Sequence, residues 1–278
     1  MNLVLAHGFL GFRQKFGKDY FNGVEKFLAQ TFGAKTLAAQ VDPDGGIAER
    51  SAQLQRQILL ALGKLPPASE AERRGHNTLD PQQKTHIIAH SMGGLDSRML
   101  LSLNRENIAS HIASLTTIST PHRGSPIADL LVAGLDEGFG WALLQRLLAW
   151  RIESVLEKLG VSLEGLRDLT SASCAAFNEK YRDHPQVKYF SVAGMGRNRG
   201  RATAKLLQLA HKYIRGKTGE SNDGLVSLSS AQWGEFDEAL WAADHADEIG
   251  HDLDHLFRAP SFDHLAAYRK IVERVRAF

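Results

Sequence analysis

A chain of 278 residues, of which 43% are hydrophobic and 23% charged, is long enough to bury a large core in a single α/β domain. The formal net charge of +2 does not decide for or against nucleic acid. The chain has no long basic run and no interleaving of aromatic and basic residues, so no nucleic-acid partner is expected. The single cysteine, Cys174, excludes an internal disulfide, and the apolar residues that follow it predict a buried side chain.

The amino-terminal apolar run, residues 2–6, predicts neither a secretory leader nor a membrane span. It is short, has no basic residues before it and leads directly into a glycine-containing loop. No stretch of the chain reaches the roughly 18 consecutive apolar residues of a membrane-spanning helix. These features predict a soluble protein that is cytoplasmic, or exported by a route that the amino terminus does not encode.

Strands and helices alternate along the chain, which is typical of a parallel sheet with helices on both faces. The predicted strands lie at residues 3–6, 35–38, 85–89, 111–118, 187–192 and 240–243. The predicted helices run from residue 19 or 20 to 32, and over 47–62, 95–103, 171–181 and 260–278. Residues 66–83 are polar and contain proline, which indicates a surface excursion. We therefore expect a single α/β domain over residues 1–278.

The segment Ala89–Gly94 lies between a predicted strand and a predicted helix. A small-x-Ser-x-Gly turn in this position is the setting of a nucleophile elbow, which makes Ser91 a candidate nucleophile. Small residues are needed there because the turn brings the strand and helix backbones close together. Ala89 replaces the commoner first glycine, and so short a pattern also occurs in ordinary strand–turn–helix connections. The rest of the chain must therefore support the assignment.

A serine hydroxyl needs a histidine base and an acid that orients the base, and in α/β-hydrolases these follow in the order Ser, Asp or Glu, His. His245 follows the last predicted strand and is the candidate base. Asp223 precedes it in the required order and is the candidate acid. Each has a plainer alternative, because His245 also fits a surface histidine among acids, and Asn-Asp-Gly is a favourable turn.

The loop His7–Gly11 follows the first predicted strand and is a candidate for one half of an oxyanion hole. The predicted donors are the backbone N–H groups of Phe9 and of Met92, the residue after the candidate nucleophile. The alternative is an ordinary glycine-rich βα loop. A dinucleotide site is excluded, because the spacing is not G-x-G-x-x-G and no acidic residue follows at the right distance.

Taken together, these segments resemble the bacterial triacylglycerol lipases of the Pseudomonas–Proteus group. The resemblance rests on His7–Phe12, His90–Gly94, Thr116–Ser125, Asn222–Val226 and His245–Glu248, which follow the family order across nearly the whole chain. It implies an α/β-hydrolase fold, hydrolysis of acyl esters and a mobile lid. It also implies the same nucleophile, acid and base as the order along the chain.

A lid is also indicated by the residues themselves. Residues 134–166 fit the alternation of strands and helices poorly and look inserted after the fourth predicted strand. Within them, residues 141–159 carry leucine, isoleucine and valine at helical spacing, and Trp141 and Trp150 add apolar surface on other sides. A segment apolar on more than one face suits a helix that covers an acyl pocket and opens onto lipid. A fixed cap is the alternative.

One feature of the family is altered in this sequence. Its members tend to bind a structural calcium near the catalytic histidine, and Asp247 matches one ligand of that site. The preceding segment, residues 194–222, has no aspartate and a single glutamate, so we expect no bound metal. Our hypothesis is that a guanidinium from Arg199 or Arg201 pairs with Asp247 instead. The alternative is calcium bound through carbonyl groups and water.

The sequence therefore predicts a serine hydrolase that cleaves carboxylic ester bonds of lipids through an acyl-enzyme, with no cofactor and with transient contact to a lipid surface. Two other functions stay open. The first is a short-chain carboxylesterase or acyltransferase with the same triad. The second is a non-catalytic binding protein that kept the fold, and the presence of serine, aspartate and histidine in order argues against it.

Overall fold

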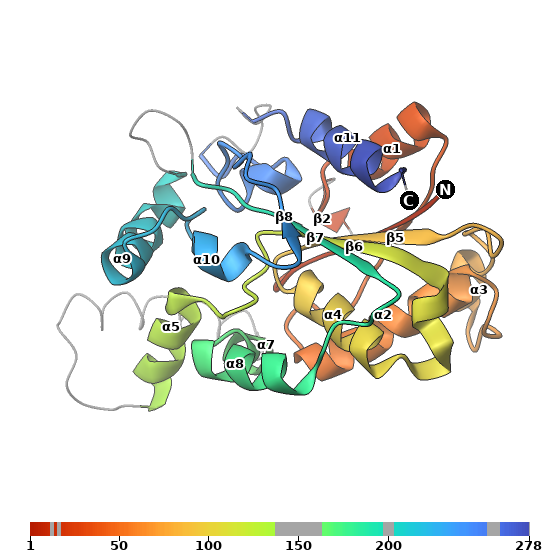
Figure 1. Ribbon diagram of the computed structural model, residues 1–278, viewed down its shortest axis with the longest axis horizontal. Helices are drawn as coiled ribbons and strands as arrows, with labels where there is room; N and C mark the ends of the chain where they lie inside the picture. Colours follow the sequence, from red (N-terminus) through yellow and green to blue (C-terminus); the bar gives the residue numbers. More distant parts are fainter. Residues whose placement is uncertain (12–13, 16–17, 137–162, 197–202, 255–261, 278) are drawn as a thin grey trace.

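The computed structural model describes residues 1–11, 14–15, 18–136, 163–196, 203–254 and 262–277 (Figure 1). Within this part of the chain, six strands form one parallel sheet in the order β4-β1-β5-β6-β7-β8. These strands are β1 Asn2–Ala6, β4 Lys35–Ala38, β5 Thr85–His90, β6 Ile112–Ile118, β7 Lys188–Val192 and β8 Glu235–Phe236. A separate antiparallel pair joins β2 (Gln14–Lys15) to β3 (Lys18–Asp19). The predicted parallel sheet is confirmed.

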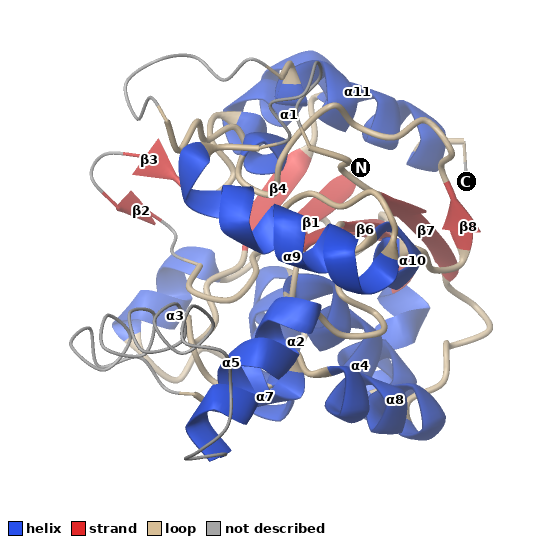
Figure 2. Cartoon of the chain, turned by 90° about the vertical axis from the view of Figure 1, so that its left-hand side faces the viewer, coloured by secondary structure: helices blue, strands red, loops and turns tan. Residues whose placement is uncertain are grey.

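Helices lie on both faces of this sheet, with α1 and α11 on one side and α2 and α4 on the other (Figures 1 and 2). The described α-helices are α1 Val24–Phe32, α2 Ile47–Ala61, α3 Glu70–Gly75, α4 Gly93–Leu103, α5 Pro126–Asp136, α7 Glu164–Asp168, α8 Ser171–Lys180, α9 Gln208–Thr218, α10 Leu228–Ala231 and α11 His264–Val275. Short 3-10 segments lie at Arg105–His111, Lys205–Leu207 and Asp247–Ile249. Among the described helices, none is long and apolar enough to cross a membrane.

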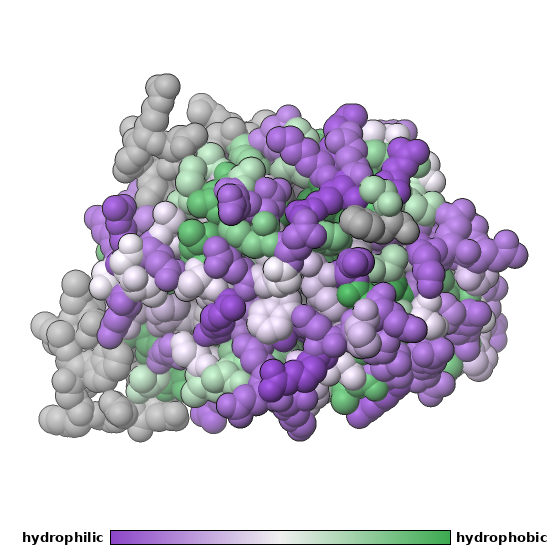
Figure 3. All heavy atoms as spheres, in the orientation of Figure 1, coloured by the Kyte–Doolittle hydropathy of each residue, from purple (hydrophilic) through white to green (hydrophobic). Residues whose placement is uncertain are grey.

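Successive side chains of the central strands point to opposite faces of the sheet, so two hydrophobic cores form, one on each face. Leu3 and Leu5 of β1 pack with α1 and α11, whereas Val4 packs with α2 and α4. Each of these side chains is fully buried, and each such burial stabilises the fold by about 1.5–3 kcal/mol. Hydrophilic residues cover most of the face drawn in Figure 3, in keeping with this partition. Cys174 is buried, as its neighbours predict, and burial raises the pKa of its thiol to about 12.

Three predicted elements differ from the structure. The helix expected from residue 19 or 20 begins at Val24, because Gly23 before it takes a left-handed backbone with φ of 73°. The strand expected at 240–243 is wrong. The sixth strand is β8, and Trp241 forms only an isolated bridge to Gly194. The last helix begins at His264 rather than at residue 260, because the Asp263 carboxylate caps it by accepting from a backbone N–H of the first turn.

Most of the predicted lid lies outside the described residues, which stop at residue 136 and resume at 163. Helix α5 leads into this interval and α7 follows it. The polar excursion predicted at residues 66–83 contains the short helix α3 and has no buried residue on that helix.

Candidate active site

The segments that carry the predicted catalytic residues are connections at the carboxyl edge of the parallel sheet. The loop His7–Gly11 follows β1, and Ser91 follows β5 directly. Asp223 lies on the connection from β7 to β8, and His245 lies after β8. Such connections converge at one edge, which is where open α/β sheets bind their ligands.

Ser91 has the backbone conformation of a nucleophile elbow. Its φ is 55°, a left-handed value that non-glycine residues rarely adopt, and its N–H donates to the carbonyl of Ile118 over 2.9 Å. A side chain at Gly93 would collide with the backbone of Ala6, so strand β1 and helix α4 approach as closely as the motif predicts. Ala89 lies inside β5 and is fully buried, so its methyl group is accommodated in the strand.

Asp223 is fully buried, and its two carboxylate oxygens have different partners. Oδ1 accepts the backbone N–H groups of Leu225 at 2.8 Å and Val226 at 2.7 Å. The Nδ1–H of His245 donates to Oδ2 over 2.7 Å, and the backbone N–H of His245 donates to the Asp223 carbonyl over 3.0 Å. This arrangement leaves the Nε2 atom of the imidazole as the acceptor for a substrate-side proton.

Ser91 and His245 line the same cavity, which has a volume of about 320 Å³. Its wall is mostly apolar and includes Phe9, Ile127, Ala128, Leu131, Leu166, Leu169, Leu207, Leu225 and Val226. The described residues include no hydrogen-bond partner for Ser91 Oγ, so the bond to the histidine is not formed in this state. Such bonds are often long in unliganded enzymes and tighten when substrate binds.

The loop after β1 leaves one N–H group unused. The N–H of Gly8 donates to Tyr20 Oη over 3.0 Å, and the N–H of Leu10 donates to the carbonyl of Pro43 over 2.6 Å. Between them, the N–H of Phe9 has no partner among the described residues, and neither has the N–H of Met92. The two donors predicted from the sequence are therefore available to an anion near Ser91.

Arg50, a fully buried residue of α2, anchors the same loop and is indicated by no sequence motif. Its guanidinium donates to the carbonyls of His7 at 2.8 Å and Asp42 at 2.5 Å, and its Nε donates to Asp96 Oδ2 at 2.9 Å. Burial raises the pKa of Asp96 to about 6, and the charge of Arg50 acts in the opposite direction. His7 is kept neutral because burial lowers its pKa to about 4. The sequence shows Arg50 only as one of the polar residues of an amphipathic helix, and this pattern does not predict its contacts with the loop.

Asp244, which no motif singled out, orders the loop that carries His245. Its Oδ1 accepts two backbone N–H groups of that loop, at 3.1 and 3.0 Å. Its Oδ2 accepts the N–H of Ala204 at 2.8 Å and the hydroxyl of Thr203 at 3.2 Å. These four hydrogen bonds use the four lone-pair positions of the carboxylate. The loop is therefore tied to the segment that begins at residue 203.

Asp247, the residue expected to pair with an arginine, is fully buried, and its Oδ2 accepts the N–H of Asp244 over 3.1 Å. Arg199 and Arg201 lie outside the described residues, so their pairing with Asp247 stays a prediction. Calcium needs several oxygen ligands, usually with more than one carboxylate. The expected absence of a bound metal at this loop therefore stays a prediction.

Two further ionisable side chains adjoin His245. The rings of His90 and His245 lie 4.4 Å apart, and Glu248 Oε2 lies 3.9 Å from His245 Nδ1. Burial lowers the pKa of His90 well below its usual value, and the neighbouring His245 acts in the same direction. Burial also raises the pKa of Glu248 well above its usual value, and the Asp223 carboxylate adds to this effect. Both residues lie in motifs that carry the family resemblance.

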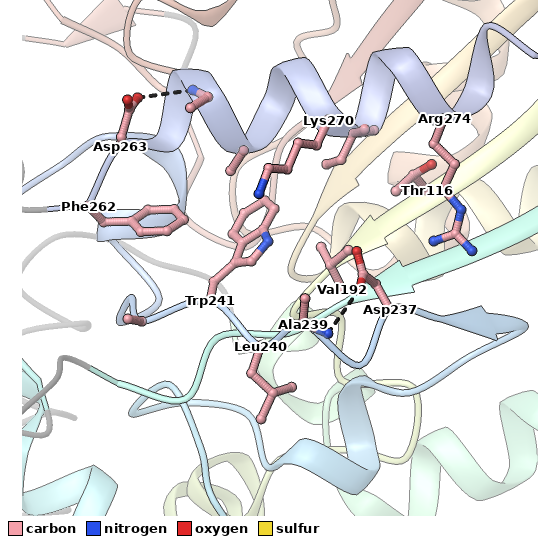
Figure 4. Close-up of a pocket in the computed structure, with 14 residues that line it drawn as sticks. Thr116, Val192, Asp237, Ala239, Leu240, Trp241, Phe262, Asp263, Lys270 and Arg274 are labelled. Atoms are coloured by element: carbon pink, nitrogen blue, oxygen red, sulfur yellow. Dashed lines mark hydrogen bonds between the residues drawn. The ribbon is translucent and has the colours of Figure 1, made fainter.

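A second cavity, of about 260 Å³, lies beside α11 (Figure 4). Its wall includes Trp241, Phe262, Lys270 and Arg274, and contains neither serine nor histidine. It therefore offers no serine–histidine pair, and the candidate active site is the cavity next to Ser91.

The chain is similar to several known proteins. A family model described as a PGAP1-like alpha/beta domain matches residues 52–136. Triacylglycerol lipase 2 of Saccharomyces cerevisiae is 34% identical over 231 residues, which cover 83% of this chain and 62% of the yeast protein. The chain thus spans less than two thirds of that relative. The triacylglycerol lipase of Pseudomonas fragi is 26% identical over 281 residues, covering 90% of this chain and 87% of the relative.

Among solved structures, the Staphylococcus hyicus lipase is similar, with a TM-score of 0.69 at 20% identity. The similarity covers 99% of this chain and 96% of that one. At this identity the likeness establishes the fold, which is the predicted α/β-hydrolase type with a mostly parallel sheet.

Proposed function

We propose that this chain is an α/β-hydrolase related to the triacylglycerol lipases, and that it is a serine hydrolase that cleaves carboxylic ester bonds of lipids. The observation that carries the proposal is the 2.7 Å hydrogen bond between Asp223 and His245, at a cavity that Ser91 also lines. A histidine held in this way is an oriented base, and it lines the same cavity as a serine on a left-handed turn.

In the proposed mechanism, Ser91 Oγ attacks the ester carbonyl while His245 Nε2 takes its proton. Asp223 holds the Nδ1–H of the ring and stabilises the imidazolium that forms. The N–H groups of Phe9 and Met92 stabilise the tetrahedral oxyanion. His245 then gives its proton to the alcohol, which leaves, and the same nitrogen activates the water that releases the acyl group. No cofactor takes part.

The walls of the cavity support a lipid substrate. Apart from the catalytic groups, the wall is made largely of leucine, isoleucine, valine and phenylalanine side chains, which favour an acyl chain over a polar group. Leu10 lines the cavity and is 44% exposed. Leu206 and Leu209, at 77% and 58% exposed, flank Leu207, which also lines it. Exposed apolar residues at a cavity mouth suit transient contact with a lipid surface.

We further propose that residues 1–278 form one domain, in which residues 134–166 are a lid. The described ends of the interval support this placement, because α5 and α7 both contribute side chains to the wall of the cavity. Ile127 and Leu131 come from α5, and Leu166 comes from α7. The proposed lid is therefore flanked in sequence by two helices that both line the candidate active site.

The proposal is tested by labelling the whole chain with a fluorophosphonate and locating the adduct by mass spectrometry. The adduct is expected on Ser91, and Ser91→Ala is expected to fold normally and lose nearly all turnover. A residual rate of about 10³-fold over water is expected from binding and the oxyanion donors. The matched control is Ser110→Ala, which changes a serine that does not line the cavity. If Ser91→Ala keeps wild-type hydrolysis, the proposed mechanism is wrong.

The same triad would also serve a short-chain carboxylesterase or an acyltransferase. Rates on p-nitrophenyl esters of increasing chain length separate these functions. A lipase is expected to keep or gain activity with long chains presented as an emulsion, whereas an esterase loses it. An acyltransferase is revealed by transfer to an added alcohol in preference to water.

A further inference from the structure

A chain of buried hydrogen bonds runs from the loop after β1 to the loop that carries His245. The N–H of Gly8 donates to Tyr20 Oη over 3.0 Å, and the Tyr20 hydroxyl contacts His90 Nδ1 at 2.7 Å. On the other side of the ring, His90 Nε2 lies 3.1 Å from Glu248 Oε2. The side chains of Tyr20, His90 and Glu248 are all buried, so water does not compete for these bonds.

The direction of donation along this chain follows from the chemistry of its members. Burial lowers the pKa of His90 well below its usual value and so keeps the ring neutral, and a neutral imidazole has one donor and one acceptor nitrogen. Tyr20 Oη already accepts from Gly8, so its own proton is donated to His90 Nδ1. The Nε2–H of His90 is then donated to Glu248. Each internal member therefore accepts one hydrogen bond and donates the next.

The far end of the chain is fixed to the sheet and to the base. Glu248 Oε1 accepts the hydroxyl of Ser119 over 2.6 Å, and Ser119 Oγ accepts the N–H of Gly194 over 3.1 Å. Ser119 directly follows strand β6, and Gly194 lies two residues after the end of strand β7. The other oxygen of Glu248 lies 3.9 Å from His245 Nδ1. The carboxyl group thus adjoins the base while it is held from the opposite side.

The near end of the chain sets the direction of the Phe9 N–H. A Cβ atom added to Gly8 would lie 2.6 Å from Ser91 Cβ and 2.9 Å from Tyr20 Oη, so this part of the loop sits against both residues. The N–H groups on either side of Phe9 are both engaged, one by Tyr20 and one by a loop carbonyl. The Gly8 N–H belongs to the peptide just before the one that carries the Phe9 N–H, and the Gly8 carbonyl accepts the N–H of Gly11 at 3.1 Å. Removing the Tyr20 hydroxyl would therefore release the loop at the peptide next to the donor and leave the Gly8 carbonyl as its remaining anchor.

On the basis of the proposed function, we propose that Tyr20, His90 and Glu248 are positioning residues of the reaction. They hold the oxyanion donor on the Phe9 loop and the His245 base in fixed relation to each other across Ser91. Tyr20 carries the proposal most directly, because its hydroxyl is the partner of the loop N–H next to the donor.

The test is Tyr20→Phe, assayed on p-nitrophenyl butyrate in solution so that no lipid surface is involved. Losing a whole oxyanion donor costs about 10²–10³ in kcat, and a misaimed donor is expected to cost about 10–100-fold. KM is expected to stay within about twofold, because the interaction lost is made in the transition state. Inactivation by a fluorophosphonate, whose phosphoryl oxygen occupies the oxyanion position, is expected to slow in proportion.

Tyr268→Phe is the matched control. Tyr268 is also a fully buried tyrosine, and its ring lies 6.2 Å from that of Phe21, which packs against Tyr20 at 5.0 Å. Its hydroxyl has no hydrogen-bond partner among the described residues. This variant is expected to leave kcat unchanged, so it reports what removal of a buried hydroxyl does by packing alone.

A double variant tests whether the chain acts as a unit. Glu248→Gln keeps the size of the side chain but replaces one of its two oxygens with an NH₂ group, which cannot accept the hydrogen bond from His90 or Ser119, and it is expected to lower kcat. If the residues are coupled, Tyr20→Phe with Glu248→Gln is expected to cost about as much as the more damaging single change. Two costs that multiply would mean that the residues act independently, and this would overturn the proposed coupling.

Three further results would overturn the inference. One is a Tyr20→Phe variant whose kcat stays within about twofold of the wild type. Another is a rise in KM alone, which would make Tyr20 a substrate contact. The third is an equal loss in Tyr268→Phe with an equal fall in Tm, which would reduce the effect to packing. If Ser91→Ala is also active, the proposed function fails, whereas an inactive Ser91→Ala confines the failure to this inference.

Discussion

Replacing Asp223 with asparagine is expected to inactivate the protein while leaving its fold intact, and the structure specifies why. One oxygen of the carboxylate accepts two backbone N–H groups, at 2.8 and 2.7 Å, and the other accepts His245 Nδ1–H at 2.7 Å. In Asp223→Asn the amide oxygen must face the two N–H groups. Turning the NH₂ group toward them would leave two buried donors unsatisfied, at about 1–3 kcal/mol each.

The amide NH₂ group then faces His245 and donates to Nδ1. The ring proton moves to Nε2, which is no longer able to accept the proton of Ser91. This loss of the correct tautomer is expected to cost about 10⁴ in turnover. The assay is the initial rate on p-nitrophenyl butyrate, with the circular dichroism spectrum and Tm as checks of folding. Asp237→Asn, at an acid whose Oδ1 also accepts a backbone N–H, is the control and is expected to keep its activity. Activity of Asp223→Asn within about tenfold of the wild type would refute the assignment of the acid.

Three further predictions follow from other parts of the structure. The double variant Leu206→Asp with Leu209→Asp is expected to slow hydrolysis of long-chain emulsions more than hydrolysis of soluble esters. The control is Leu103→Asp, at another exposed leucine, which is expected to slow neither reaction. Equal effects of the double variant on both substrates would contradict contact of Leu206 and Leu209 with lipid. Burial lowers the pKa of His86 from 6.5 to about 4, so the unfolded state binds more protons between these pH values and stability falls as pH falls through this window. In urea denaturation, His86 is expected to change the free energy of unfolding by up to about 1.4 kcal/mol per pH unit in this window. The variant His86→Gln is expected to remove this pH dependence. If the free energy of unfolding depends on pH equally in the variant and the wild type, His86 does not titrate in this way. Because we expect Asp247 to pair with a guanidinium of the preceding loop, EDTA is expected to change neither activity nor Tm, and a large loss that added calcium restores would favour a metal site.

Local patterns determined most of the framework of this protein. The continuous apolar run of β1 and the strand–turn–helix around Ser91 depend on neighbours within a few positions, so the sequence alone is enough to predict them. The order of Ser91, Asp223 and His245 along the chain predicted a triad, and the structure brings Asp223 and His245 into contact and places Ser91 on the same cavity. The sixth strand was predicted in the wrong place because the short run near residue 240 is apolar enough to resemble a strand. In the structure, Trp241 in this run forms only an isolated bridge to Gly194.

Only the tertiary structure decided which polar residues surround those three. His90 and Glu248 are 158 positions apart in the sequence but are hydrogen-bonded. Ser119 and Glu248, which are also hydrogen-bonded, are 129 positions apart. Arg50 is buried against a loop more than 40 residues away. No periodicity or motif records such contacts, because they depend on where the sheet places each loop and on the need of buried polar groups for partners. The sequence by itself predicted Ser91, Asp223 and His245 from their order along the chain, whereas the packing of the sheet decided which other polar residues surround them.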